Sequence, residues 1–174
     1  LIEQFREGEE YRFAFVKNEI VAIAKRVPAN VVGDGVSTIE QLIEAKNKER
    51  EERKNPIHKK IKINDEILRI LKLSNRDLET IPEQGEVVYL RRNSNVSTGG
   101  DAIDVTDEID DEIKEIVRKA TMSIPGLRVA GLDVIIDENK NISIIEINPY
   151  AMFSMHHYPW EGKPRNVAKK FIEA

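Results

Sequence analysis

Residues 127–150, LRVAGLDVIIDENKNISIIEINPY, limit the possible folds of this chain more than any other stretch. Two runs rich in valine, isoleucine and leucine flank a short polar segment, a composition typical of a β-hairpin. If a four-residue loop joins the two strands, Asp137 pairs with Ile142 and closes the loop. Asp133 then lies directly opposite Glu146 on the neighbouring strand.

Three oxygen-bearing side chains interrupt these apolar strands. Because side chains alternate between the faces of a strand, Asn148 is expected beside Glu146, on a face that also carries Ile142 and Ile144. With Asp133 opposite, two carboxylates and an amide form the hard-oxygen set that suits Mg²⁺ sharing its shell with phosphates. The alternative is that the polar residues mark the solvent face of an antiparallel pair. Isoleucines beside the acids argue against that alternative.

Composition narrows the function classes. The 174 residues are 40% hydrophobic, enough for one globular domain with a core. A net charge of -4 gives no attraction to nucleic acid or to an anionic membrane, and no apolar run is long enough for a membrane span. The absence of cysteine excludes disulfides, thiolate nucleophiles and cysteine-bound zinc. We expect a cytoplasmic protein and, since the chain opens on Leu1 in strand-like sequence, a segment of a longer one.

Near the N-terminus, two acids stand seven residues apart, Glu3 and Glu10. Residues 11–16 and 20–27 are strand-like and are expected to pair through a tight turn at 17–19. The chain contains neither a G-x-G-x-x-G nor a Walker A motif. Any phosphate would therefore be held by metal ions and cationic side chains.

Four segments have helix patterns, one of them at 65–73 with Ile67, Ile70 and Leu71 facing inward. Ser37 or Thr38 can cap a helix, with Glu or Gln in the third position of a capping box. This helix is expected to dissolve into a charged loop or insertion at 44–62, which has few apolar residues to order it. Residues 107–124 carry apolar side chains at helical spacing, and 165–174 form a short closing helix.

Residues 85–104 contain the most unusual loop of the sequence. A strand presenting Arg91 and Arg92 runs into NSNVSTGG, which offers side-chain and backbone donors and two glycines. Glycines let backbone N–H groups approach a ligand closely, and arginine adds charge-assisted bonds, so the loop is suited to surround anionic oxygen. A polar surface loop without a ligand is the alternative.

The adjacent His156 and His157 lie in an irregular segment near the C-terminus. They lack an H-E-x-x-H frame or a third ligand at fixed spacing. Substrate contact or ordinary packing is therefore expected of them, and not a direct chemical role.

Three blocks carry a family resemblance: G-L-D-V-I-I followed by I-I-E-I-N-P in the hairpin, residues 3–30 followed by VVGDGVSTI at 31–39, and LRRNSNVSTGGDAID at 90–104. Together they resemble the ATP-grasp domain shared by the bifunctional glutamate–cysteine ligase/glutathione synthetases and by cyanophycin synthetase. The resemblance covers nearly the whole chain. It implies an α+β fold, the C-terminal half of an ATP-grasp domain with an antiparallel sheet and packed helices, as a single domain over 1–174.

The resemblance also implies roles for individual residues. Asp133, Glu146 and Asn148 would hold two Mg²⁺ ions, or Mn²⁺, against the phosphates of ATP, and Arg91 would stabilise the transferring phosphoryl group. The residues expected to contact the nucleotide are Glu3, Phe5, Glu10, Asn93 and Asn95. Those expected to contact the substrate are Ser97, Thr98, Gly99 and Gly100.

The implied chemistry is amide formation through an acyl-phosphate. A substrate carboxylate attacks the γ-phosphate of ATP, and an amine then displaces phosphate. The expected partners are small amino acid or peptide substrates, first γ-glutamylcysteine and glycine, and the missing N-terminal ATP-grasp portion of the same chain. The alternative within this class is the aspartate–arginine polymer of cyanophycin synthetase. The alternative of another class is a non-catalytic fragment with weak or no nucleotide binding. The isolated segment is expected to be inactive, and a homo-oligomer stays open.

Overall fold

The computed structural model describes residues 4–173. The chain divides into two compact units, which we describe separately. The first, the sheet unit, comprises Leu1–Arg26 and Ala102–Ala174, and the second, the middle unit, comprises Val27–Asp101. Glu3, one of the predicted nucleotide contacts, lies outside the described residues.

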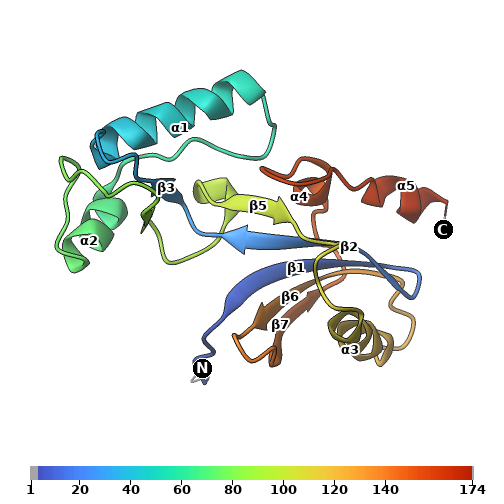
Figure 1. Cartoon of the computed structure of the whole chain (residues 1–174). Helices are drawn as coiled ribbons and strands as arrows, with labels where there is room; N and C mark the ends of the chain where they lie inside the picture. The colour runs from blue at the N-terminus through green and yellow to red at the C-terminus, as the bar shows by residue number, and fades with distance from the viewer. Residues whose placement is uncertain (1–3, 174) are drawn as a thin grey trace. The chain divides into compact units, whose positions relative to one another are not determined.

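The sheet unit is built on a five-stranded sheet with the order β5-β2-β1-β6-β7 (Figure 1). Strand β1 pairs antiparallel with both β2 and β6, and β6 pairs antiparallel with β7. The strands are β1 (Glu9–Val16), β2 (Glu19–Val27), β5 (Asp101–Asp104), β6 (Val129–Ile136) and β7 (Ile142–Asn148). The antiparallel sheet expected from the sequence is therefore present.

Strands β1 and β2 form the predicted N-terminal hairpin. Val16 pairs with Glu19, so the connection has two residues, Lys17 and Asn18. Both have positive φ, 43° and 71°, as the turns that match strand twist require. The tight turn and a β-bulge at Val21 together set the register that places Arg12 and Arg26 in the sheet.

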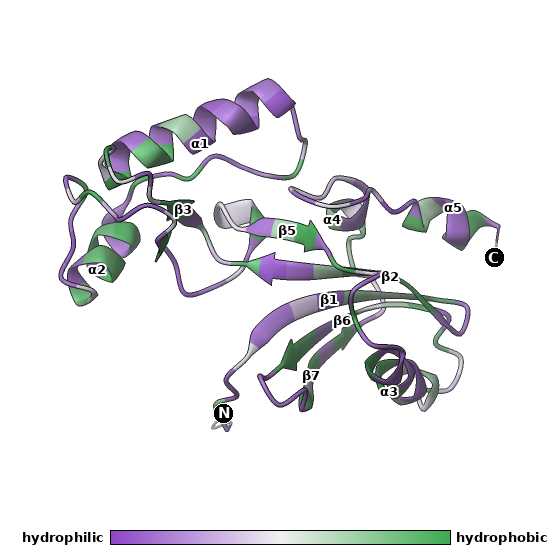
Figure 2. Cartoon of the chain, in the orientation of Figure 1, coloured by the Kyte–Doolittle hydropathy of each residue, from purple (hydrophilic) through white to green (hydrophobic). Residues whose placement is uncertain are grey.

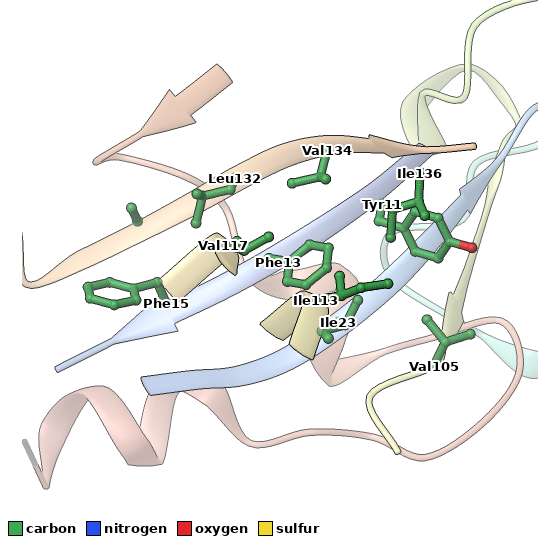
Figure 3. Close-up of a cluster of buried hydrophobic side chains, with 11 residues drawn as sticks. Tyr11, Phe13, Phe15, Ile23, Val105, Ile113, Val117, Leu132, Val134 and Ile136 are labelled. Atoms are coloured by element: carbon green, nitrogen blue, oxygen red, sulfur yellow. The ribbon is translucent and has the colours of Figure 1, made fainter. Parts of the chain in front are cut away.

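One face of the sheet carries the apolar core of this unit. Phe13, Phe15 and Leu132 are fully buried against helix α3 (Asp111–Met122), which contributes Ile113 and Val117 (Figure 3). On the opposite face, small residues such as Ala14 and Ala22 pack near Val167. The large apolar side chains thus cover one face of the sheet, and the other face carries small and polar residues.

The C-terminal helices are shorter than the sequence predicts. Helix α3 begins at Asp111 and not at 107, because the Val105 carbonyl oxygen accepts from the N–H groups of Glu108 and Ile109 in a separate turn. Helix α5 (Val167–Ile172) begins after Asn166, whose side chain accepts from the Lys169 N–H at 2.9 Å. A short α4 (Ser154–His157) precedes it.

The middle unit packs two helices against a two-stranded sheet. The strands β3 (Asn30–Val32) and β4 (Val87–Tyr89) pair antiparallel, and the helices are α1 (Ile39–Arg53) and α2 (Asp65–Leu73). The buried core residues are Ala29, Val31, Ile39, Ile43, Ile61, Ile67, Leu71, Val88 and Leu90. A 3₁₀ turn, η1 (Val96–Thr98), lies in the glycine-containing loop.

The prediction of a loop at 44–62 is wrong for residues 44–53, which are helical. Helix α1 has the predicted capping box, formed by Thr38 and Gln41, but it continues to Arg53. Its second half is hydrophilic (Figure 2), yet the side chain of Arg50 is 1% exposed. Polar contacts of Asn47 and Arg50, which apolar periodicity does not reveal, hold this half of the helix. No helix in residues 4–173 is both long and apolar enough to cross a membrane.

Candidate metal and nucleotide site

Asp133 and Glu146 are cross-strand partners on β6 and β7, as predicted. The register that brings them together differs from the expected one. Ile136, not Asp137, pairs with Ile142, so the connecting loop is one residue longer than predicted. A β-bulge at Ile145 restores the offset, since Val134 pairs with Ile144 and Asp133 with Glu146.

Because of the bulge, the predicted position of the isoleucines on the face of the acids is wrong. Ile142 and Ile144 pack against the apolar core and not beside Glu146. The extra residue reverses the alternation of β7 between Ile144 and Glu146. The argument from isoleucines beside the acids therefore fails, although the pairing of the acids holds.

Six polar residues share the face opposite the core. The register places Arg12 beside Asp133 on the neighbouring strand, Glu10 opposite Arg26, and Asn148 opposite Gly131. We call this set the polar face: Glu10, Arg12, Arg26, Asp133, Glu146 and Asn148. Four neighbouring strands thus bring three acids, two arginines and an amide onto one surface.

Arginines hold Asp133 through both of its carboxylate oxygens. Arg12 donates from Nε to Oδ1 at 2.5 Å and from Nη2 to Oδ2 at 3.0 Å. Arg26 Nη1 lies 3.2 Å from the same Oδ2. A Cβ on Gly131 would meet Ala151 Cβ at 2.4 Å and Arg12 Cδ at 3.2 Å, so the glycine leaves room for both side chains. Composition and periodicity gave no sign of this ion-pair cluster.

The donor chemistry of the polar face fits a hard cation that shares its shell with phosphate. Glu146 is exposed, and Asn148 is half-buried with its Oδ1 accepting from the Tyr150 N–H at 2.8 Å. Among residues 4–173, no group of three or more His, Cys, Asp or Glu side chains lies close enough to hold a metal ion alone. Two carboxylates and an amide are the kind of incomplete set that Mg²⁺ uses with substrate oxygens.

The predicted phosphate and substrate loop lies in the middle unit. Asn93, Asn95 and Ser97 are exposed, and the Thr98 hydroxyl donates to Asn93 Oδ1 at 3.1 Å. Gly99 has φ of +102° and caps the 3₁₀ turn, while the Gly100 N–H donates to the Asn95 carbonyl oxygen at 3.0 Å. The loop is therefore a defined turn that presents polar side chains to solvent.

Arg91, the predicted catalytic cation, is buried in the middle unit. It is 8% exposed, and its Nη1 pairs with the Glu66 carboxylate on α2. Its Nε has no hydrogen-bond partner among the described residues. A phosphoryl group would have to replace Glu66 as its partner or bind the remaining donors.

A buried ion-pair cluster beneath the loop was not predicted. Asp101, with a side chain 4% exposed, accepts from Arg50 Nη2 at 2.6 Å and from Lys46 Nζ at 2.6 Å. Arg50 Nη2 also donates to the Gly99 carbonyl oxygen at 2.8 Å. These contacts join α1 to the end of the loop formed by residues 93–100, which we call the glycine loop. The Asp after the glycines and the basic residues at 46 and 50 were visible, but their pairing depends on tertiary structure.

Relatives with known names match almost the whole chain. The bifunctional glutathione biosynthesis protein of Listeria innocua is 39% identical over 99% of this chain, which covers 23% of that protein. The crystal structure of a bifunctional glutathione synthetase from Pasteurella multocida is 34% identical, with a TM-score of 0.82 over 98% of this chain and 24% of that one. The chain has the ATP-grasp fold of that enzyme segment. The fold class predicted from the sequence is thus confirmed.

A second group of relatives shares this ATP-grasp segment. The cyanophycin synthetase of Geminocystis herdmanii is 37% identical over 99% of this chain, which covers 21% of that protein. A scan against protein-family models gave no match. The chain spans about a quarter of the length of the relatives it resembles.

A cavity of about 670 Å³ lies at the start of β1 in the ATP-grasp sheet unit. Phe5, Gly8 and Tyr11 line it together with residues 137–139 of the β6–β7 turn. Phe5 is 82% exposed and, among the lining residues that the structure describes, is the one predicted nucleotide contact. Glu10 lies instead on the polar face, opposite Arg26.

His156 is buried in the sheet unit, whereas His157 is half-buried. His156 is 1% exposed, and neither ring nitrogen has a hydrogen-bond partner among the described residues. Burial and the nearby Arg12 guanidinium lower the pKa of His156 to about 3. His157 Nε2 accepts from the Ala168 N–H at 3.2 Å. His156 is thus packed in the interior of the unit, and His157 is bound to the backbone of α5.

Proposed function

We propose that this chain is the ATP-grasp part of an ATP-dependent carboxylate–amine ligase that joins γ-glutamylcysteine and glycine to glutathione. The observation that carries the proposal is the Asp133–Glu146 pair on the polar face, in a chain 39% identical to a glutathione biosynthesis protein. Because the chain spans 23% of that relative, the activity belongs to a longer protein in this proposal. The proposal includes a cytoplasmic location.

Asp133, Glu146 and Asn148 would hold Mg²⁺ against the ATP phosphates in this ligase. The bound ion would supply positive charge where the carboxylate and the γ-phosphate, both anionic, must meet. The chain itself would act by positioning and electrostatics, without a protein nucleophile. Arg12 and Arg26 add two cationic groups to the same surface, within ion-pair distance of Asp133.

The glycine loop would hold the remaining anionic oxygens. Asn93 and Asn95 present amide groups to solvent, and Ser97 presents an exposed hydroxyl group. The N–H groups of Thr98, Gly99 and Gly100 donate to carbonyl oxygens within the loop, so a ligand that uses them would have to replace these bonds. We assign the asparagines to metal-linked phosphate and residues 97–100 to the substrate carboxylate. Arg91 would stabilise charge on the transferring phosphoryl group.

Cyanophycin synthesis is the second candidate within the same mechanism. It is favoured by the relative of that name, which is 37% identical over 99% of the chain. The two candidates share the phosphoryl chemistry and differ in the carboxylate and the amine. A non-catalytic segment with weak nucleotide binding is the candidate of another class.

The test is ADP release by the full-length protein that carries this chain. We expect Mg²⁺-dependent ADP release with γ-glutamylcysteine and glycine, and at least a ~100-fold loss in Asp133→Asn and Glu146→Gln, as for other electrostatic groups in active sites. Glu112→Gln, an exposed carboxylate on α3, is the matched control and should retain activity. ADP release only with an aspartate primer and arginine would support cyanophycin synthesis in place of glutathione synthesis. Near wild-type activity of both carboxylate variants would refute the metal site.

A further inference from the structure

Asp133 has little capacity left for a metal ion. A carboxylate offers about four lone-pair sites, and three arginine donors already lie against its two oxygens. A cation that binds Asp133 must displace at least part of this arrangement. The side chains of Arg12 and Arg26 are 13% and 12% exposed, so they are close enough to the surface to exchange partners.

The local charge also gives a cation little net attraction. The polar face carries three acids and two arginines, so its net charge is only -1, and Glu10 lies opposite Arg26. Both guanidinium groups lie within 3.2 Å of the Asp133 carboxylate, so they repel a divalent ion at the same short range at which this carboxylate attracts it. A metal ion alone should therefore bind weakly here.

A nucleotide changes this balance. Phosphate oxygens are bidentate acceptors for guanidinium groups, as the Asp133 carboxylate is. If Arg12 turns from Asp133 to a phosphate, the arginine keeps an anionic partner and Asp133 becomes available to the metal. Two negative charges or more arrive with the phosphates, so the metal also gains attraction.

We propose that Arg12 and Arg26 act as exchangeable counter-ions that make metal binding at Asp133 depend on the nucleotide. This inference rests on the proposed function, since it takes the ligand to be a metal–nucleotide complex. The two arginines are positioning residues in this reaction. By linkage, the nucleotide must raise the affinity for the metal by the same factor by which the metal raises the affinity for the nucleotide.

The experiment is a pair of titrations on the full-length protein. One uses Mn²⁺ alone as a paramagnetic probe, and the other uses Mg²⁺ with the non-hydrolysable analogue adenylyl imidodiphosphate. Arg12→Gln should bind Mn²⁺ about tenfold more tightly than the wild type and the magnesium nucleotide about tenfold more weakly, a typical coupling between sites. Arg26→Gln, which loses one contact with Asp133, should shift both affinities in the same directions by less.

Lys25→Gln is the matched control. Lys25 is next to Arg26 on β2 but pairs with Glu9, so neither affinity should change. Arg12→Lys keeps the charge without the bidentate geometry, so its effect on both affinities should be intermediate. This variant replaces Arg12→Gln in the test if Arg12→Gln folds poorly. The gain in Mn²⁺ affinity should vanish in Arg12→Gln with Asp133→Asn.

Two results would overturn the inference. Weaker or unchanged Mn²⁺ binding in Arg12→Gln would show that the arginine supports Asp133 or is irrelevant to the metal. A gain that persists without Asp133 would place the metal elsewhere. Failure of the wild-type protein to bind the magnesium nucleotide at all would instead refute the proposed function.

Discussion

Arg50 joins helix α1 to the glycine loop by donating to both the Gly99 carbonyl oxygen and the Asp101 carboxylate. The same guanidinium donates through Nη1 to the Lys59 carbonyl oxygen. Three separate segments of the middle unit therefore depend on one buried side chain. The loop owes its shape to this helix as much as to its own glycines.

Arg50→Lys should destabilise the protein and loosen the loop. Lysine keeps a positive charge but cannot reach the three acceptors from one planar group. We expect a loss of about 2–3 kcal/mol in the free energy of unfolding, because breaking a buried ion pair is costly. In the proposed ligase, the KM for the carboxylate substrate should rise more than kcat falls. Arg53→Gln, on the same helix with a side chain 45% exposed, should change neither quantity.

Gly99→Ala should be costly for a reason that Gly126→Ala lacks. Both glycines have positive φ, +102° and +77°, so alanine is strained at either position. A Cβ at Gly99 would also lie 2.9 Å from Ile61 Cγ1, whereas nothing lies within 4 Å of one at Gly126. Denaturant unfolding should show about 1 kcal/mol lost for Gly126→Ala and about twice that for Gly99→Ala. Equal losses would mean that Ile61 moves freely.

Asp133→Asn should lower stability, whereas Glu146→Gln should not. Repulsion between two carboxylates alone would favour the opposite sign for Asp133. However, Asp133 is the partner of two largely buried arginines, and its neutralisation leaves them uncompensated. We expect a loss of about 1–3 kcal/mol for Asp133→Asn and less than about 0.5 kcal/mol for the exposed Glu146. A higher melting temperature for Asp133→Asn would contradict the ion pairs.

His156 should make the protein less stable in acid. Its pKa of about 3 in the folded protein lies below the ordinary value near 6.5, because burial disfavours the charged ring. Between these values the unfolded chain binds a proton that the folded chain does not, so stability falls as the pH falls from about 6.5 toward 3. His156→Phe should reduce this slope. Chemical denaturation at pH 7 and pH 5 measures the difference.

The sequence predicted the fold and the partners of the hairpin, but not the contacts that hold the site. The pairing of Asp133 with Glu146 was predicted from a four-residue loop and holds only because a longer loop and the bulge at Ile145 offset each other. The turn at Lys17 followed from local preference. The helix through Arg50 was missed because polar tertiary contacts, and not an apolar stripe, stabilise it. The pairing of Arg12 with Asp133 was missed because it joins residues 121 positions apart.

The bulge at Ile145 has a consequence for recognising distant relatives. Asp133 and Glu146 face each other because a long loop and one extra strand residue offset each other. A hairpin without the extra residue would place the same two acids opposite each other with one residue fewer between them. The number of residues separating two ligands in a sequence motif is therefore a poor guide to homology in such hairpins. A search that tolerates a single deletion after Ile144 would detect relatives that a fixed spacing rejects.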